Sequence, residues 1–208
     1  MSHRASRYGV VVGLALAGLL PACTQGGTPL DQLESEMSSS LITDGVAHAV
    51  LRDANNVVVA NVRFGTHTVG SRIQVTGVGL TTGIHGFHVH ANNDPSNGDG
   101  CIGPTFVSAD GHYNPSGGVH PNHAGDMPVL FFSTAQAAFA GSPTFGYNDF
   151  ISSNFTPDEV KGKAIIIHAL PDNCANIPTR YTPQPPDATT LATGDAGGRV
   201  ACGVVKKD

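Results

Sequence analysis

The chain has 208 residues, of which 26 are glycine and only 13% are charged, a composition typical of one turn-rich domain with extensions. The formal net charge is −5, and no basic patch is present that could neutralise a row of phosphates, which argues against nucleic-acid binding. The lack of a heptad pattern, of a Gly-X-Y period and of a long apolar run beyond the N-terminus excludes coiled-coil, collagen-like and multispan membrane proteins.

Residues 1–22 have the composition of an export signal. Basic side chains without an acidic partner precede an apolar stretch from Val10 to Leu20, which is too short for a comfortable membrane span. The stretch leads into Leu-Pro-Ala-Cys ending at Cys23, which resembles a bacterial lipobox in which Pro21 is unusual. We predict a lipoprotein signal peptide over residues 1–22 and lipidation of Cys23, with simple secretion or an uncleaved anchor as alternatives.

Residues 23–44 comprise this cysteine and a segment rich in Ser, Gly, Thr and acidic residues, which predicts a flexible tether. The folded domain is expected over residues 45–208. With Cys23 lipidated, the remaining cysteines are Cys101, Cys174 and Cys202. An exported location permits one disulfide among them, and spacing leaves all three pairings open.

The first predicted elements are strands. Apolar residues alternate in two bursts between Ala47 and Phe64, separated by the turn-like residues 53–56, which predicts a hairpin. Ile73 and Val75 are followed by Val78 and Leu80, so the alternation shifts by one residue. The intervening Gly77 predicts a β-bulge at that point.

Further strands are predicted from residue 83 and over residues 129–132, 137–139, 163–168 and 200–205. The strand at 163–168 is apolar enough to be buried on both faces. Residues 91–128 and 181–198 are predicted to be long loops, and residues 156–159 a single helical turn begun by Thr-Pro. Short strands, Gly-rich turns and two long loops predict an all-β sandwich or barrel.

The histidines are unusual in number and position, because six of the ten fall between His85 and His123. His88 and His90 are two apart on a predicted strand, so both imidazoles leave the same face about 6.6 Å apart along the chain and can share one metal. His85 has the same parity, and we interpret it as a structural histidine bonded to the backbone. Cys174 is interpreted as a small buried residue.

A second cluster follows in the long loop, where His112, His120, His123 and Asp126 offer donors that suit zinc. A loop without its own core would gain order from such binding. His168 ends the apolar run 165–167, and an imidazole buried there needs a compensating partner.

Several motifs, HGFHVH, GHYNP, HAGDMP, IIIHA and TGDAGGRVACGVV, resemble those of the copper-zinc superoxide dismutase family, over residues 47–205. The resemblance implies a Greek-key β-barrel of eight strands. It implies that copper is held by His88, His90, His112 and His168, and zinc by His112, His120, His123 and Asp126, with His112 bridging the two metals. It also implies that Asp172 links a copper histidine to a zinc histidine, that Arg199 attracts the anionic substrate, and that Cys101 and Cys202 form a disulfide.

One departure from the family pattern bears on zinc. Only two residues separate His120 from His123, where many family members have a longer segment. If this short segment does not wrap zinc, a copper-only dismutase remains. The segment between Cys101 and His112 is also longer than usual.

The function implied is superoxide dismutation by Cu(II)/Cu(I) cycling in an exported, periplasmic or cell-surface protein, attached to the membrane only through Cys23. The alternatives are a copper-binding or storage protein on the same barrel and a zinc hydrolase. The hydrolase is disfavoured because Asp126 is already used as a ligand and no H-E-x-x-H helix is present. Superoxide is the expected substrate, no nucleic acid is expected, and monomer and homodimer both stay open.

Overall fold

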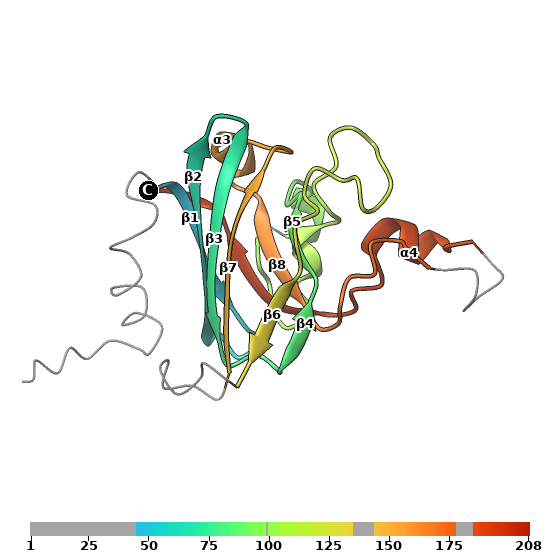
Figure 1. Ribbon diagram of the computed structural model, residues 1–208, viewed down its shortest axis with the longest axis horizontal. Coiled ribbons are helices and arrows are strands. Elements are labelled where there is room, and N and C mark those ends of the chain that lie inside the picture. The colour runs from blue at the N-terminus through green and yellow to red at the C-terminus, as the bar shows by residue number, and fades with distance from the viewer. Residues whose placement is uncertain (1–44, 99, 135–143, 178–184) are drawn as a thin grey trace, which may run out of the picture.

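The computed structural model describes residues 45–98, 100–134, 144–177 and 185–208. Within these ranges, ten antiparallel strands form one sheet that curls into a nearly closed barrel (Figure 1). The predicted signal peptide, the lipidated Cys23 and the tether lie outside the described residues. Among the residues that are described, no helix is long and apolar enough to cross a membrane.

The strands are β1 (Gly45–Arg52), β2 (Val58–His67), β3 (Gly70–Val78), β4 (Gly83–His85), β5 (Phe87–His90), β6 (Leu130–Ser133), β7 (Phe145–Ser152), β8 (Ala164–His168), β9 (Arg199–Val204) and β10 (Lys206–Lys207). The helical elements are η1 (Pro95–Asn97), η2 (Val107–Ala109), α3 (Pro157–Val160) and α4 (Ala188–Thr193).

The sheet order is β4-β6-β7-β3-β2-β1-β9-β8-β5, and β10 adds to β1. The two end strands, β4 and β5, are consecutive parts of one stretch that Gly86 interrupts, so the two ends of the sheet come together and the barrel is nearly closed. If β4 and β5 are counted as one strand and the two-residue β10 is set aside, the barrel has the eight strands expected. The all-β barrel prediction is confirmed.

The predicted hairpin of β1 and β2 is confirmed, and Asp53 shapes its turn. The Asp53 carboxylate accepts the backbone N–H groups of Asn55 at 2.9 Å and Val57 at 2.8 Å. Asn56 adopts a positive φ of 64°, a conformation that asparagine tolerates well.

The bulge predicted at Gly77 is wrong. The pairing of β3 runs in regular register through this residue, which opposes Ala60 on β2 and Gly146 on β7. A Cβ atom on Gly77 would lie 2.7 Å from Cζ of Phe132. The glycine is therefore required because an aromatic ring fills the space above the strand, a contact that the sequence pattern does not reveal.

The core lies on both sides of β8, whose five residues are all buried, as predicted. Ile165 and Ile167 belong to the main core inside the barrel. Ile166 faces the other way and packs with Phe106 and Cys202. The long loop 91–128 thus contributes to a small apolar cluster of its own against the barrel.

Strand β7 was not predicted, because polar Asn148 and Asp149 interrupt its apolar pattern. Asp149 lies on the sheet and accepts hydrogen bonds from Arg72 and Gln74 of the neighbouring β3, so a partner strand satisfies its charge. The strand predicted at 137–139 lies outside the described residues. Strands near 130, 164 and 199 and the capped turn α3 are confirmed.

The predicted loop 181–198 contains a helix, α4, so that part of the prediction is wrong. Asp187 caps its N-terminus by accepting the N–H of Thr190 at 2.8 Å, and Gly194 ends it in the left-handed conformation. Asp at the start and Gly just after the end are the signals that could have revealed this helix.

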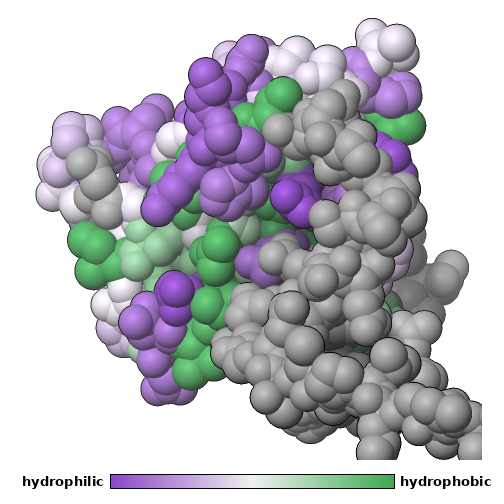
Figure 2. All heavy atoms as spheres, turned by 90° about the vertical axis from the view of Figure 1, so that its left-hand side faces the viewer, coloured by the Kyte–Doolittle hydropathy of each residue, from purple (hydrophilic) through white to green (hydrophobic). Residues whose placement is uncertain are grey.

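Figure 1 shows α4 and the loop 91–128 on one side of the barrel, away from β1 and β2. Figure 2 views the opposite side. In its coloured part, small groups of hydrophobic residues lie among hydrophilic ones.

Candidate metal centre

The candidate ligands gather where β5 and β8 meet the loop 91–128. His88 and His90 are both buried on β5, and their pairing with β8 places them opposite Ile166 and Ala164. His168 ends β8, and its backbone N–H donates to Gly86 O at 2.8 Å. Two neighbouring strands therefore deliver three imidazoles to one place.

The loop reaches the same place because it pairs with the free edge of β5. Tyr113 N–H donates to Val89 O and Val89 N–H donates to Gly125 O, each at 2.8 Å. A Cβ on Gly125 would lie 2.2 Å from Val89 O, so only glycine allows this approach. Single bridges then join His90 to His112 and His88 to Asp126.

The loop is also fixed at its start by the Cys101–Cys202 disulfide, the pairing that the family resemblance implied. The two cysteines are 101 residues apart, and closing a loop of that length stabilises the fold by about 4.7 kcal/mol on the chain-entropy view. Strand pairing, a small core and a disulfide therefore order this loop together.

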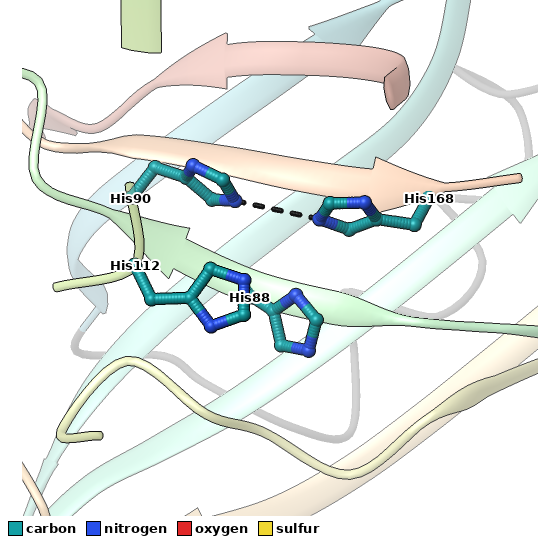
Figure 3. Close-up of side chains that lie close together, drawn as sticks. All are labelled: His88, His90, His112 and His168. Carbon is teal, nitrogen blue, oxygen red and sulfur yellow. Dashed lines mark hydrogen bonds between the residues drawn. The ribbon is translucent and has the colours of Figure 1, made fainter. Parts of the chain in front are cut away.

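Figure 3 shows the strand-side group, four buried imidazoles that turn toward one another. The ring centroids of His88 and His112 are 4.0 Å apart, and Nε2 of His90 lies 3.4 Å from Nε2 of His168. One ring nitrogen from each residue lies within 4.8 Å of the others. The group consists of His88, His90, His112 and His168.

Hydrogen bonds fix the tautomers of two of these rings. Nδ1 of His90 lies 2.8 Å from Asp110 O, and Nδ1 of His168 lies 3.0 Å from Gly197 O. A carbonyl oxygen only accepts, so Nδ1 of each ring carries the proton and Nε2 presents a lone pair. Two lone pairs aimed at each other across 3.4 Å suit a cation placed between them.

Asp172 orients two further rings. Its carboxylate oxygens lie 2.6 Å from Nε2 of His88 and 2.8 Å from Nε2 of His120. Within the described residues, Nδ1 of His88 and Nε2 of His112 are buried without a hydrogen-bond partner, and Nδ1 of His120 faces only the Asp126 carboxylate, at 3.1 Å. Buried nitrogens without partners are costly, and a bound metal would satisfy them, so this donor set fits a metal.

The loop-side group, His112, His120, His123 and Asp126, adjoins the first. Asp126 oxygens lie 2.8 Å from Nδ1 of His112 and 3.1 Å from Nδ1 of His120. Nδ1 of His123 lies 3.2 Å from Nδ1 of His112. The structure thus brings the four residues together despite the short spacing between His120 and His123. His88 also lies near, within 4.8 Å of donor atoms of His112, His120 and Asp126.

Burial lowers the pKa values of most of these histidines, including the loop-side His123, whereas the pKa of His120 is raised. On the strand side, burial lowers the pKa of His90 well below its ordinary value and that of His168 to about 3. On the loop side, burial lowers the pKa of His120, but hydrogen bonds to Asp126 and Asp172 outweigh it and raise that pKa to about 9.

The two carboxylates respond to the same neighbours. Burial raises the pKa of Asp126, but hydrogen bonds from His112 and His120 outweigh it and hold this pKa far below the ordinary range. The pKa of Asp172 is lowered likewise through His120 and His88. Both carboxylates are therefore charged and available to a cation or its ligands.

Arg199 lies over a cavity of about 520 Å³ that His90, His112 and His168 also line. Its guanidinium donates to the carbonyl oxygens of Phe106 and Asp110. Burial lowers the pKa of Arg199, and a guanidinium still keeps its charge. A cation is thus fixed at the mouth of the strand-side group.

Sequence reasoning missed the groups that hold these side chains. The Asp110 carbonyl accepts from both His90 and Arg199, and a backbone oxygen leaves no trace in the residue pattern. Thr189, Thr193 and Asp195 line the cavity because α4, which was not predicted, places them there.

Two other expectations have opposite outcomes. His85 is bonded to the backbone as predicted, with Nδ1 2.7 Å from His168 O and Nε2 2.9 Å from Thr81 O. Cys174 is exposed rather than buried, so that prediction is wrong. The backbone N–H of Cys174 donates to Asp172 at 2.7 Å, which holds this turn so that its side chain points outward.

Fold and site together define an all-β protein with a paired, histidine-rich metal centre. A family model described as "Copper/zinc superoxide dismutase (SODC)" matches residues 58–205. The chain belongs to the copper/zinc superoxide dismutase family. Copper and zinc are the metals of this family. Two overlapping sets of side chains could hold a metal ion, namely the strand-side group and the set of His88, His112, His120 and Asp126.

Named relatives agree with this assignment. The chain is 39% identical over 170 residues to superoxide dismutase [Cu-Zn] of Mycobacterium tuberculosis, covering 74% of the chain and 66% of the relative. It is 34% identical over 210 residues to the protein of that name from Mycolicibacterium paratuberculosis, covering 92% and 87%. Among solved structures, the clock protein EA4 is 28% identical, with a TM-score of 0.58 over 80% of this chain and 96% of that one.

Proposed function

We propose that the chain is an exported superoxide dismutase, which converts two superoxide anions and two protons into dioxygen and hydrogen peroxide. The observation that carries the proposal is the convergence of four buried imidazoles beside a cavity that also holds Arg199. Copper bound there would supply the one-electron oxidation and reduction of superoxide. Imidazole donors suit copper, and the curated relatives are named for this activity.

In this proposal the strand-side group, His88, His90, His112 and His168, holds copper, and the loop-side group, His112, His120, His123 and Asp126, holds zinc. His112 belongs to both because its Nδ1 faces Asp126 and its Nε2 has no hydrogen-bond partner among the described residues. Between two cations its ring would lose both protons. Asp172 orients one ring of each group, which supports the role that the resemblance implied.

The side chains have separate tasks in the reaction. Arg199 attracts superoxide into the cavity and orients it, because its bonds to Phe106 and Asp110 hold the guanidinium in place. His112 can carry a proton at Nε2 and deliver it to the reduced product, since in the part of the chain that the structure describes no group bonds to that nitrogen.

The test is stopped-flow decay of superoxide by the full chain loaded with copper and zinc, compared with the metal-free chain. We expect rapid decay that requires metal. Tight copper binding without turnover would contradict the enzyme and support a copper-binding or storage protein. Activity that needs copper but is unchanged by removing zinc would support a copper-only dismutase.

Replacing Arg199 tests the role of its charge. The variant Arg199→Gln should lower the rate by at least about tenfold, and the rate should depend less on salt, because steering of an anion is screened by ions. Metal content measured by mass spectrometry should not change. Arg63→Gln, on β2 outside the cavity, is the control, and an unchanged rate in Arg199→Gln would refute the steering role.

We further propose export and anchoring through a lipid on Cys23. The disulfide between Cys101 and Cys202 supports an oxidising compartment. Mass spectrometry of the membrane fraction should find a diacylglycerol-modified Cys23 at the N-terminus, and Cys23→Ser should abolish this modification. An unmodified Cys23, or cleavage at another residue, would overturn the lipoprotein assignment.

A further inference from the structure

Asp110 has a backbone conformation that residues with a side chain rarely adopt. Its φ is 64° and its ψ is −159°, which lies in a region of backbone space that is nearly restricted to glycine. Aspartate tolerates a positive φ better than most residues, but mainly at the different ψ of a left-handed turn. Such strain persists only where neighbouring groups hold the residue in place. The contacts of Asp110 should therefore show what holds it and what its conformation achieves.

The carbonyl oxygen of Asp110 faces the strand-side group and has two donors there. It accepts the Nδ1–H of His90 at 2.8 Å and an N–H of the Arg199 guanidinium. The carbonyls on either side, those of Ala109 and Gly111, accept backbone N–H groups at 3.1 and 2.9 Å from the segment that follows β5. The conformation of Asp110 therefore fixes the direction of one oxygen that serves two side chains of the proposed site.

The carboxylate of Asp110 faces the turn 93–97 and is bonded through both of its oxygens. One oxygen accepts the backbone N–H groups of Asn93 at 2.6 Å and Asp94 at 2.9 Å, and the other accepts the side-chain amide of Asn97 at 2.5 Å. Hydrogen bonds to a charged acceptor are stronger than those between neutral groups. Because the carboxylate and the carbonyl belong to one residue, a carboxylate fixed in three bonds also restrains the carbonyl.

We propose that Asp110 is a positioning residue, whose carboxylate, through its bonds to the turn 93–97, aims one carbonyl oxygen at both Arg199 and His90. Without these bonds the backbone of residue 110 would relax out of its strained conformation, and the oxygen would turn away from both donors. The effect on activity rests on the proposed function, whereas the link between the carboxylate and the two side chains does not.

A positioning role has a different signature from the attraction of an anion. If its bond to Asp110 is lost, Arg199 keeps its charge and its bond to Phe106 O, so the cavity still attracts superoxide but orients it less well. The rate should then fall while its dependence on salt stays. His90 loses the acceptor of its Nδ1 proton at the same time, so that proton should exchange faster with solvent.

The experiment compares two replacements of Asp110 in the full chain loaded with copper and zinc. Asp110→Ala removes the bonds to the turn and should slow superoxide decay by about three- to tenfold, with unchanged metal content and salt dependence. Asp110→Asn removes the same charge but keeps an oxygen that can accept the N–H groups of Asn93 and Asp94, and asparagine also tolerates a positive φ. It should stay within about twofold of the wild type. The difference between the two variants isolates the hydrogen bonds from the charge.

A third variant leaves residue 110 unchanged. Asn97→Ala removes one of the three bonds and should slow the decay by about twofold, and it decides the question if Asp110→Ala does not fold. Asn154→Ala, the same change at an exposed residue between β7 and α3, is the matched control and should have no effect.

Nitrogen NMR reads the same link without turnover. In the reduced, metal-loaded chain, which is diamagnetic, the Nδ1 proton of His90 should exchange at least about tenfold faster in Asp110→Ala than in the wild type or in Asp110→Asn. The inference is overturned if this exchange is unchanged, if Asp110→Ala keeps the wild-type rate, or if Asp110→Ala and Asp110→Asn lose rate equally. Absence of dismutation in the wild type would refute the proposed function instead, and the NMR comparison would still decide the role of Asp110.

Discussion

The strand-side and loop-side groups of the metal centre are built in different ways. In the strand-side group, three of the four imidazoles belong to β5 and β8, which pair as a regular antiparallel ladder. In the loop-side group, every residue lies in the loop 91–128, which is held to the barrel by bonds to the edge of β5, a small apolar cluster and the Cys101–Cys202 disulfide rather than by a continuous ladder. Backbone pairing therefore sets the first group, whereas the second depends on how the loop is held.

The difference suggests a division of labour between the two metals. A barrel strand keeps its side chains in place whether or not a metal is present, because its backbone bonds and core packing are independent of the site. A loop side chain is held less firmly and gains more order from a bound ion. We expect copper to use a preformed site and zinc to complete its own.

Removing one ligand from each group should give the largest effect. His90→Ala should weaken copper binding by more than about 100-fold, with loss of dismutase activity, while zinc binding stays. His123→Ala should weaken zinc binding and leave copper affinity within about threefold. The loss of copper affinity expected for His90→Ala exceeds the loss of about 10–100-fold that is usual when a group that only orients a ligand is removed. Competition with chelators measures both affinities, and equal loss of both metals in either variant would contradict two separable groups.

Asp172 connects the groups, so its removal should weaken both. Asp172→Ala should lower the affinity for copper and for zinc by about 10–100-fold each, because His88 and His120 both lose the carboxylate oxygen that orients them. Asp158→Ala is the matched control, since this exposed aspartate of α3 pairs with Lys161 and belongs to neither metal-binding group. An effect confined to one metal would show that Asp172 orients only one ring.

The pH dependence of the stability of the metal-free chain should distinguish His168 from His120, and this is the smallest of the expected effects. His168 has a pKa of about 3 when folded and about 6.5 when unfolded. Only the unfolded chain therefore binds this proton between those values, and the free energy of unfolding falls as the pH drops below about 6.5. At pH 5 the loss from His168 is about 2 kcal/mol.

For His120 of the loop-side group the sign is reversed, whereas burial lowers the pKa of His123 as it does that of His168. The pKa of His120 is raised to about 9, so its contribution to stability is complete below the unfolded value of about 6.5 and is lost as the pH rises through about 9. Urea unfolding of the metal-free chain from pH 5 to pH 9 should show both limbs. His168→Gln should reduce the acid limb by about 2 kcal/mol at pH 5 and leave the alkaline limb unchanged, because His90 keeps its own lowered pKa. An unchanged acid limb in this variant would show that His168 does not contribute to it.

Several features of the fold and site could be predicted because they depend on local pattern. Alternating apolar residues revealed the hairpin of β1 and β2, and the parity of His88 and His90 placed them on one face. Strand β7 could not be predicted in this way, because Asp149 is satisfied by Arg72 on another strand. The glycine at 77 was misread for the same reason, since Phe132, which requires it, is distant in sequence.

By itself, the sequence determined the class of fold, the donor types and, through its motifs, the family. Only the tertiary structure decided how these donors are used. The tautomers of His90 and His168 depend on two backbone carbonyls, those of Asp110 and Gly197. The carboxylate of Asp172 orients two imidazole rings. Two basic side chains line a cavity beside the disulfide. The physical reason is that a residue pattern records which groups are present, whereas proton positions and accessibility depend on what folding places next to them.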